Sequence, residues 1–361
     1  MKVAILGAGA GGVSAAVELH RAGHAIRLWN RSAGALAGYT AAGGIRHEGV
    51  LGAGYTPLTV ITTDLALATR DADLLLVCLP TLAHGTLARS LIDAGIPPIP
   101  VVLNPGHTGG ALEFVEVFRA AGAAPPPTAE LSTLTYVARK AGADRVSTTG
   151  RAKRVRAAAM PGGAAALELA CTLYDCAKPV DNVLMTSLCN VNMVLHPPGA
   201  VLGAAWIEAT AGNFTFYVEG LTDGVARVME WLDAERCAVA RGFGFELPTL
   251  FAEMQAIGTI EAGIAAGAGL AAAIRGGEAN RHIKAPDAFA HRYFHEDFWY
   301  GLQPLVALAV IAGVEVPTAR SLLHLGQLAV GPAAPSTGRT AAAMGIAGLD
   351  RGGLLKFVSG G

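Results

Sequence analysis

Charged residues are scarce in this chain of 361 residues: Asp, Glu, Lys and Arg make up 15% of it, against about 25% in an average protein. The formal net charge is −1, and no segment concentrates Lys or Arg. Nucleic acids and anionic membrane surfaces require a concentrated positive field, so we expect neither as a partner. Small molecules are the expected ligands. Because 52% of the residues are hydrophobic, a homodimer could cover part of the apolar surface.

Cysteine and long hydrophobic runs are also in short supply. The cysteines show neither metal-binding spacing nor the even number of a disulfide framework; they are Cys78, Cys171, Cys176, Cys189 and Cys237. We therefore expect reduced thiols in a cytoplasmic protein, and no metal site. The longest apolar stretches, residues 263–274 and 305–314, are shorter than the ~20 residues of a membrane span. Buried helices are expected there instead.

Glycine, by contrast, is concentrated in a turn near the N-terminus that has a recognisable spacing. A short apolar strand, Val3–Leu6, leads into a Gly7-x-Gly9-x-x-Gly12 turn and then a helical run. Such a turn needs the first glycine for its tight geometry, the second for backbone approach to a pyrophosphate, and the third for helix–strand packing. The free N–H groups and dipole of the helix N-terminus favour phosphate. The whole turn, with Ala10 and Gly11, is therefore predicted to bind a dinucleotide.

The end of the second predicted strand, Ala25–Asn30, indicates which dinucleotide is bound. The sequence continues Arg31-Ser32 and lacks the acidic residue that would accept hydrogen bonds from an unmodified adenosine ribose. Arg31 can pair bidentately with a 2′-phosphate, and Ser32 can donate to it. With Asn30 included in this site, NADP is favoured over NAD. If Arg31 only stacks on the adenine, both cofactors bind.

Further strands are predicted for residues 59–62, 73–79 and 100–103, the second of them a continuous apolar run typical of a buried parallel sheet. Ligands of open α/β sheets bind outside the carboxyl ends of strands. Pro80, Asn104 and Gly106 follow such ends and are therefore predicted to border the cofactor. For Pro80 the alternative is that it belongs to an ordinary strand–helix loop. The segment that starts at Asn104 is expected to approach the nicotinamide end of the cofactor.

The remaining chain changes character near residue 180. Strands within residues 129–139 and 145–159 are predicted to extend the sheet, whereas helical spacing dominates later, as in Leu221, Val225, Val228 and Leu232. We predict an α/β fold: a Rossmann-type dinucleotide-binding domain over residues 1–180, then a mainly α-helical domain over residues 181–361. The glycine-rich end after Gly331 retains apolar residues, so we expect it to be docked.

Two segments of the helical half carry candidate chemistry. In residues 190–198 a helix is predicted to end at His196, directly before Pro197 and Pro198. Histidine titrates near neutrality and can both donate and accept a proton, although it is also favoured at helix C-termini for electrostatic reasons. Residues 291–302 combine two histidines, an arginine, two carboxylates and five other aromatic side chains. This density is unusual for a simple core helix.

These motifs together resemble the opine dehydrogenase family, which includes octopine and nopaline dehydrogenases. The resemblance spans nearly the whole chain. It rests on the glycine turn, on Asn104-Pro105-Gly106 with Gly109-Gly110 and Glu113, on residues 130–136, on Asn192 with His196-Pro197, and on Arg292-Tyr293 with Glu296-Asp297 and Gly301-Leu302. It implies reduction, by a nicotinamide cofactor, of the imine formed from a 2-keto acid and an amino acid or amine, in a reversible reaction.

The resemblance also implies residue roles. His196 would be the general acid and base, and Asp297 would orient and support its imidazole; Glu296 is the alternative partner. Arg292 would hold a substrate carboxylate through two hydrogen bonds, with Asn192 and Thr135 as further substrate-binding residues. Trp206, Trp299 and Tyr300 would shape the amine pocket or simply pack in the core. The keto acid and the amine stay open.

Two other functions compete with this interpretation. Ketopantoate and glycerol-phosphate reductases are similar at Leu28-Trp29-x-Arg31, but they use a lysine early in the second domain. Here only Lys178 lies near that boundary, directly before Pro179, which disfavours a lysine-based mechanism. A non-catalytic nucleotide-binding module would need a dinucleotide fold alone, and the histidine and carboxylate motifs would then be coincidental.

Overall fold

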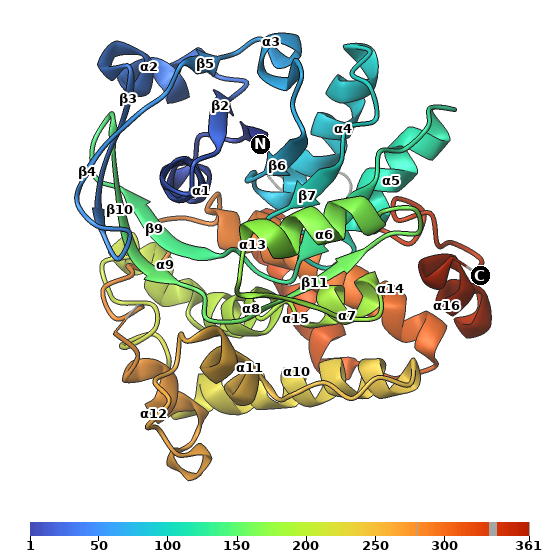
Figure 1. The fold of residues 1–361 in the computed structure, drawn as a ribbon. Helices are drawn as coiled ribbons and strands as arrows, with labels where there is room; N and C mark the ends of the chain where they lie inside the picture. The colour runs from blue at the N-terminus through green and yellow to red at the C-terminus, as the bar shows by residue number, and fades with distance from the viewer. Residues whose placement is uncertain (279, 332–337, 361) are drawn as a thin grey trace. The chain divides into compact units, whose positions relative to one another are not determined.

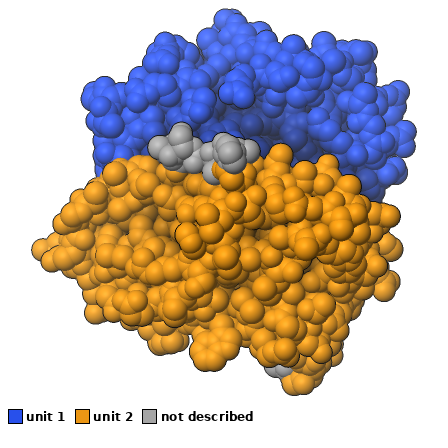
Figure 2. Space-filling view, turned by 180° about the vertical axis from the view of Figure 1, so that it is seen from behind, with its two compact units in different colours: residues 1–106, 110–183, 360 blue, residues 107–109, 184–359, 361 orange. Residues whose placement is uncertain are grey.

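The computed structural model describes residues 1–278, 280–331 and 338–360 (Figure 1). Within these ranges the chain forms two compact units, coloured separately in Figure 2. Unit 1 contains residues 1–106, 110–183 and 360, and unit 2 contains residues 107–109 and 184–359. The predicted fold class is confirmed, because a mostly parallel sheet with helices is followed along the chain by a helical unit.

The main sheet of unit 1 has the strand order β12-β11-β8-β7-β6-β1-β2-β5. Its strands are β1 (Lys2–Leu6), β2 (Ala25–Trp29), β5 (Val60–Thr62), β6 (Leu74–Val77), β7 (Val101–Leu103), β8 (Thr128–Leu131), β11 (Val155–Ala159) and β12 (Ala177–Pro179). All pairs are parallel except β8 with β11. Every residue of β6 and β7 is buried, as expected for strands with both faces covered. These apolar strands form the core that supports the glycine turn.

Helices connect these strands in the order typical of a doubly wound sheet. They are α1 (Ala10–Arg21), α2 (Ala33–Ala42), α3 (Leu65–Thr69), η1 (Thr81–Ala83), α4 (His84–Asp93), α5 (Gly110–Ala120) and α6 (Ala164–Leu173). The buried face of α1, which includes Val13, Val17 and Leu19, packs against β1 and β2. This packing holds the N-terminus of α1 at the carboxyl end of β1.

A second sheet corrects one expectation for unit 1. The prediction that strands β9 (Tyr136–Lys140) and β10 (Arg145–Arg151) extend the main sheet is wrong. They join β3 (Gly44–Gly49) and β4 (Gly54–Pro57) in a sheet of the order β4-β3-β10-β9. In β10 buried residues alternate with exposed ones, whereas β8 is buried throughout. Alternation of this kind suits a sheet with one solvated face, so the predicted segments divide between two sheets.

Unit 2 is helical. Its helices are α7 (Val183–Leu188), α8 (Asn192–Leu202), α9 (Ala204–Thr210), α10 (Asp223–Gly242), α11 (Leu250–Ile257), η2 (Ala266–Ala268), α12 (Leu270–Arg275), α13 (Arg292–Asp297), the π-helical turn η3 (Phe298–Leu302), α14 (Gln303–Ala312), α15 (Pro317–Val330) and α16 (Arg351–Ser359). Helix α8 packs against α10, α13 and α15. It is therefore the central helix of this unit.

The expectation that prolines end the helix at His196 is wrong. Helix α8 runs from Asn192 to Leu202 with Pro197 and Pro198 inside it. An internal proline costs about 3 kcal/mol, but residues 193–200 are all buried, and each large apolar side chain contributes about 1.5–3 kcal/mol on burial. Tertiary packing therefore outweighs the local preference, and His196 lies in the middle of a buried helix.

The apolar stretches behave differently from one another. Residues 263–274 do not form the one buried helix that we expected: η2 and α12 are separated by Gly269, which has φ +80°. Residues 305–314 largely coincide with α14, although Val310 is 64% exposed. In the expected tail, residues 332–337 lie outside the described residues, whereas α16 buries Leu354 and Val358. Among the described residues, no helix is long and apolar enough to span a membrane.

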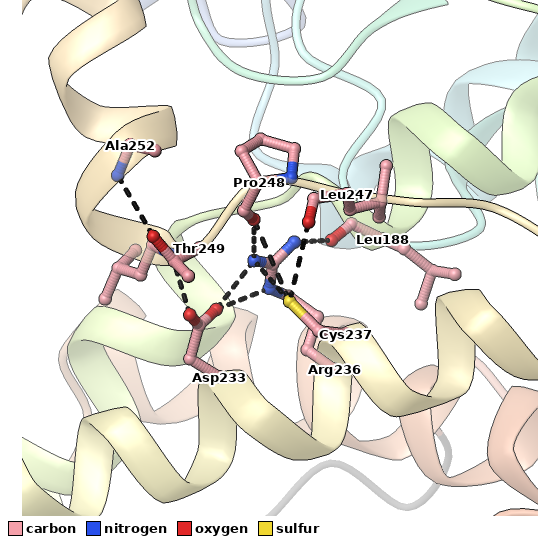
Figure 3. Close-up of polar contacts among 9 residues, drawn as sticks. Leu188, Asp233, Arg236, Cys237, Leu247, Pro248, Thr249 and Ala252 are labelled. Atoms are coloured by element: carbon pink, nitrogen blue, oxygen red, sulfur yellow. Dashed lines mark hydrogen bonds and ion pairs between the residues drawn. The ribbon is translucent and has the colours of Figure 1, made fainter.

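A buried arginine braces the inside of unit 2. Figure 3 shows the guanidinium of Arg236, on α10, between Asp233 and the carbonyl groups of Leu188 and Pro248. The donor–acceptor distances are 2.6–2.9 Å, and Asp233 also accepts from the N–H of Leu250 at 2.7 Å. Arg236 thus connects α10 to the start of α11 and to the end of α7, directly before α8.

Candidate active site

The glycine turn of unit 1 has the geometry of a phosphate cradle. Gly7 adopts φ +124°, and a Cβ on Gly12 would collide with the carbonyl oxygen of Gly7. Gly9 caps α1 in an extended conformation, and a Cβ built there meets nothing within 4 Å. No described side chain caps this helix, and its first turn holds no acidic residue. The open helix N-terminus therefore suits an anionic group.

The other residues predicted to bind the cofactor lie at the same edge of the sheet. Asn30 follows β2, Pro80 follows β6, and Asn104 and Gly106 follow β7, in strands that are parallel neighbours around β1. The side chain of Asn30 accepts from the N–H of Ala8 at 3.2 Å, which ties the end of β2 to the glycine turn. Arg31 and Ser32 are exposed beyond it. The residues present fit a dinucleotide.

Thr135 and Asn104 form a buried pair within unit 1. The Asn104 side chain donates to the Thr135 hydroxyl at 3.0 Å and accepts from the Thr135 N–H at 3.2 Å. This reciprocal pairing fixes the segment after β7 to the loop between β8 and β9. In this structure Thr135 thus orients Asn104.

A buried side-chain cluster lies in unit 2, around His196. Its Nδ1 is 2.6 Å from Oδ2 of Asp297, the last residue of α13, and its Nε2 is 2.7 Å from the hydroxyl oxygen of Tyr217. All three residues are at most 5% exposed. Since a carboxylate only accepts, Nδ1–H donates to Asp297; when the imidazole is neutral, its Nε2 accepts from the Tyr217 hydroxyl. Asp297, and not Glu296, contacts the imidazole.

Aromatic rings enclose the imidazole from the sides. Tyr293 stacks on it with ring centroids 3.7 Å apart and an interplanar angle of 13°, and Phe216 meets it edge-on at 6.0 Å. These rings exclude water and fix the plane of His196. The ring of Tyr293 also carries the guanidinium of Arg292 at 5.5 Å from its centroid.

Arg292 lies at the edge of this buried cluster, and its charged side chain faces the solvent. Its side chain is 54% exposed, and Nη1 lies 3.6 Å from Oε2 of Glu296. The other oxygen of Glu296 lies 3.5 Å from Nε2 of His107, a buried residue with φ +61°. A buried histidine–carboxylate pair therefore lies near an exposed guanidinium that can take a carboxylate ligand.

Burial sets the protonation preferences around the cluster. It lowers the pKa of His107, partly offset by Glu296 and Asp297, and it lowers the pKa of His291 to about 4, with a further contribution from Arg292. Burial also raises the pKa of Tyr217 well above its usual value. Tyr217 is consequently a neutral hydroxyl near neutral pH, and His291 is a neutral acceptor.

Sequence reasoning missed Tyr217, Phe216 and His107. The first two lie in a turn between α9 and α10, where no periodic pattern marks them. His107 lies in a glycine-rich segment after β7, and nothing in that segment indicates its partner Glu296. Of the residues expected near the amine, Trp299 is buried, whereas Trp206 is 40% exposed and stacks on Phe214 at 3.9 Å. Asn192 begins α8 and is half-buried, one turn before His196.

A dinucleotide-binding α/β unit and a helical unit with a buried histidine–carboxylate pair define the class of this protein: it is an NAD(P)-dependent oxidoreductase. Comparison with known proteins identifies the family. Residues 179–330 match the family described as NAD/NADP octopine/nopaline dehydrogenase, alpha-helical domain, and residues 3–104 match ketopantoate reductase PanE/ApbA. The opine dehydrogenase of Arthrobacter sp. (strain 1C) is 32% identical over 357 residues, covering 98% of each chain. The chain belongs to the opine dehydrogenase family, whose members act on CH–NH bonds.

More distant relatives match by sequence or by fold. Vitopine synthase of Allorhizobium ampelinum is 25% identical over 80% of this chain and 78% of its own. Octopine dehydrogenase, solved with NADH and L-arginine, superposes with a TM-score of 0.75 at 18% identity, covering 100% of this chain and 98% of its own. Yersinopine dehydrogenase with NADP+ gives a TM-score of 0.73 at 19% identity over the same shares. At these identities, the structural neighbours support the fold.

Proposed function

We propose that this enzyme joins a 2-keto acid to an amino acid or a simple amine by reversible reductive condensation, with His196 as its general acid and base. The observation that carries the assignment is the buried His196–Asp297 pair, 2.6 Å apart, in a chain of the opine dehydrogenase family. Condensation followed by reduction needs a group that both gives and takes protons near neutral pH, and histidine is the side chain suited to this.

The dinucleotide would be held by the glycine turn Gly7–Gly12 and by Asn30, Pro80, Asn104 and Gly106 at the edge of the sheet. When bound, the nicotinamide supplies the hydride that reduces the imine carbon. The residues of the turn bind and orient: backbone N–H groups at the start of α1 face the pyrophosphate, and Asn30 keeps the turn in shape through Ala8.

His196 would protonate the departing oxygen when the keto acid and the amine condense, and would take a proton in the reverse reaction. Asp297 holds Nδ1–H, which fixes the tautomer and stabilises the charged imidazolium. The enclosing rings of Tyr293 and Phe216 exclude water that would otherwise weaken this electrostatic support.

Arg292 would bind the carboxylate of the keto acid. Its exposed guanidinium offers two parallel N–H donors, which fit a carboxylate and set the orientation of the adjacent carbonyl carbon. Asn192, on the same helix as His196, would add a hydrogen bond to substrate. Thr135 would contribute through Asn104, which it holds in place.

NADP is the preferred cofactor in this proposal. Arg31 and Ser32 are exposed directly after β2, where no acidic residue follows the strand, so a 2′-phosphate would find a cation and a hydroxyl donor. The variant Arg31→Ala should raise KM for NADPH roughly tenfold or more, given about 1.5–3 kcal/mol for a charge-assisted hydrogen bond, and leave KM for NADH unchanged. Equal effects on both nucleotides would contradict the preference.

The decisive experiment follows NADPH and NADH oxidation with pyruvate, 2-oxoglutarate, oxaloacetate and glyoxylate, each alone and with a panel of amino acids and simple amines. Oxidation that requires both a keto acid and an amine is the expected result. Oxidation by a keto acid alone would instead favour a hydroxyacid reductase, the activity named by the family that matches residues 3–104. No oxidation with any pair would contradict this assignment of the substrates.

Assembly and location complete the proposal. A homodimer would cover apolar side chains exposed on three helices that pack together: Trp231 on α10, Val310 on α14 and Leu328 on α15, at 64–70% exposure. Light scattering of the wild type and of Leu328→Glu should show a dimer and a monomer. A cytoplasmic location is supported by the five cysteines, which form no disulfide among the described residues.

A further inference from the structure

Tyr217 occupies the nitrogen through which His196 would exchange protons with a substrate. With Asp297 on Nδ1 and the Tyr217 hydroxyl on Nε2 at 2.7 Å, both ring nitrogens are hydrogen-bonded. The ring face and an edge are covered by Tyr293 and Phe216, and His196 is 3% exposed. A substrate oxygen can therefore reach the proton of His196 only through Tyr217 or by displacing it.

The turn that carries Tyr217 is braced against displacement. The carboxylate of Glu219 accepts from the N–H and the hydroxyl of Thr215, at 2.6 and 2.7 Å. The N–H of Phe216 donates to the carbonyl of Ile283 at 2.9 Å, and the Tyr217 ring packs against Phe216 at 5.2 Å between centroids. Moving the hydroxyl away would disturb this packing, whereas proton transfer through the hydroxyl would leave it intact.

We propose that Tyr217 is a catalytic residue that relays the proton between His196 and the substrate oxygen. The inference rests on the proposed function, since it assigns the atom that delivers the proton. It follows from a single hydroxyl that can donate in only one direction at a time. With neutral His196, the Tyr217 hydrogen points to Nε2. With protonated His196, Nε2–H donates to Tyr217, and the Tyr217 hydrogen becomes available to a substrate.

The relay balances for the dehydration that forms the imine. The C–O bond of the carbinolamine breaks as the nitrogen lone pair forms the C=N bond. The Tyr217 proton goes to the departing oxygen, which leaves as water, while the Nε2 proton of His196 moves to Tyr217. His196 ends neutral, Tyr217 is unchanged, and the positive charge passes to the iminium nitrogen. Because the two transfers are concerted, no tyrosinate forms, so the raised pKa of Tyr217 is no obstacle.

Arg292 indicates on which side the substrate lies. Its guanidinium lies 5.5 Å from the centroid of the Tyr293 ring, which stacks on His196, and its side chain is the exposed one of the group. A keto acid bound by its carboxylate to Arg292 would thus present its oxygen toward the Tyr217 hydroxyl. The other titratable groups that influence His196 or Tyr217 are Asp297, Tyr293 and His291.

The test compares Tyr217→Phe, which deletes only the hydroxyl, with Tyr39→Phe. Tyr39 lies in unit 1, and its buried hydroxyl bonds to no residue that the structure describes. We expect Tyr217→Phe to lower kcat about 10²–10³-fold with KM values for keto acid, amine and nucleotide within about threefold, and Tyr39→Phe to match the wild type. Full or increased kcat in Tyr217→Phe would overturn the relay and indicate that the substrate displaces Tyr217 from His196.

A second readout separates the relay from a structural role. Single-turnover rates in H2O–D2O mixtures should depend non-linearly on deuterium content in the wild type, because two protons move together, and linearly in the residual reaction of Tyr217→Phe. Linear dependence in both would overturn the relay. ¹⁵N NMR of the free enzyme should show the Nε2 signal of His196 shifting in Tyr217→Phe, with the Nδ1 signal unchanged; an unmoved Nε2 signal would disprove the hydrogen bond.

His196→Asn distinguishes failure of the relay from failure of the proposed function. If His196→Asn is inactive while Tyr217→Phe is fully active, His196 acts directly and only the relay is wrong. If His196→Asn retains wild-type kcat, the acid–base assignment itself is wrong. The relay predicts that the double variant is no slower than His196→Asn, since both residues act in one step.

Discussion

The glycine turn of unit 1 and the His196 cluster of unit 2 differ in the groups that they offer to a ligand. The turn consists of consecutive residues and works through backbone geometry: Gly7 for its φ, Gly9 for open space and Gly12 for close packing. The cluster combines side chains from α8, from the turn at residue 217 and from α13. It works through side-chain chemistry held by packing.

This difference determines how each site can fail. The glycine turn should lose its ligand when a side chain is added to one of its glycines, and the effect should stay local. The His196 cluster should lose its function when one of its side chains is removed, or when distant contacts no longer hold its helices in place. Variants that separate these modes of failure should therefore affect one region and leave the other intact.

The largest effect is expected for Asp297→Asn. The amide has nearly the same size, but its NH2 group can donate to Nδ1, which favours the wrong tautomer of His196. We expect kcat to fall about 10³–10⁴-fold, with nucleotide affinity in unit 1 unchanged, as measured by steady-state kinetics and fluorescence titration with NADPH.

Glu296→Gln is the matched comparison for Asp297→Asn. Glu296 is next in sequence and equally buried, but it faces His107 and Arg292. We expect at most a roughly tenfold loss, mainly in kcat/KM for the keto acid, because the interaction with Arg292 is weakened and the imidazole is untouched. If Glu296→Gln were the more damaging of the two, the assignment of Asp297 would be wrong.

The second largest effect tests the brace. Arg236→Met removes one partner of a buried ion pair and leaves Asp233 uncompensated, which should lower the free energy of unfolding by about 3–5 kcal/mol. Urea denaturation followed by tryptophan fluorescence measures it. Arg241→Met, an exposed position in the last turn of the same helix, should change it by at most about 0.5 kcal/mol. Similar losses in both variants would exclude a specific role for the buried network.

An intermediate effect is expected in unit 1. Gly12→Ala places a methyl group against the carbonyl of Gly7, and overpacking of this kind costs about 1–3 kcal/mol. Nucleotide Kd should rise roughly tenfold to a hundredfold. Gly85→Ala, where the added carbon would find its nearest neighbour at 3.6 Å, should leave it unchanged. Gly12→Ala with wild-type nucleotide affinity would contradict the proposed site.

The smallest effect concerns pH. His291 caps α13 by accepting from the N–H of Tyr293 at 3.3 Å, and its pKa is lowered from 6.5 to about 4, by burial first and then by Arg292. The unfolded state thus binds the proton more readily, so this contribution to stability is present above about pH 6.5 and is lost as the pH falls toward 4. The melting temperature should fall more steeply over this window in the wild type than in His291→Asn, whose amide caps without titrating. Parallel curves would contradict the assignment.

Local signals made the fold of unit 1 predictable. Apolar runs, the glycine turn and the missing carboxylate after β2 lie within a few residues of one another, and the backbone responds to them directly. The second sheet could not be predicted, because it depends on the pairing of β10 with β3, which lies about a hundred residues earlier. Pairing at that separation leaves no periodic trace.

The side-chain cluster around His196 in unit 2 could be predicted from the sequence only in part. His196, Arg292 and Asp297 stood out by residue type and by resemblance to a family, but local rules placed His196 at a helix end because two prolines follow it. Packing of α8 against three helices overrode those rules. Tyr217 could not be predicted from the sequence, because it lies in an irregular turn and only the folded structure brings its hydroxyl into contact with the imidazole of His196.

The π-helical turn η3, between α13 and α14, has a consequence for how such sites can change. A π turn holds one residue more than an α turn, so a single-residue deletion within residues 298–302 would restore α geometry without breaking the helix. A turn of either kind is one full revolution, so the direction of α14 relative to Asp297 would hardly change, and Asp297 and the core face of α14 could both keep their partners. What the deletion would remove is the local widening of the helix directly after Asp297. Such a widened turn can therefore be gained or lost through one residue, with the helices on either side kept in place.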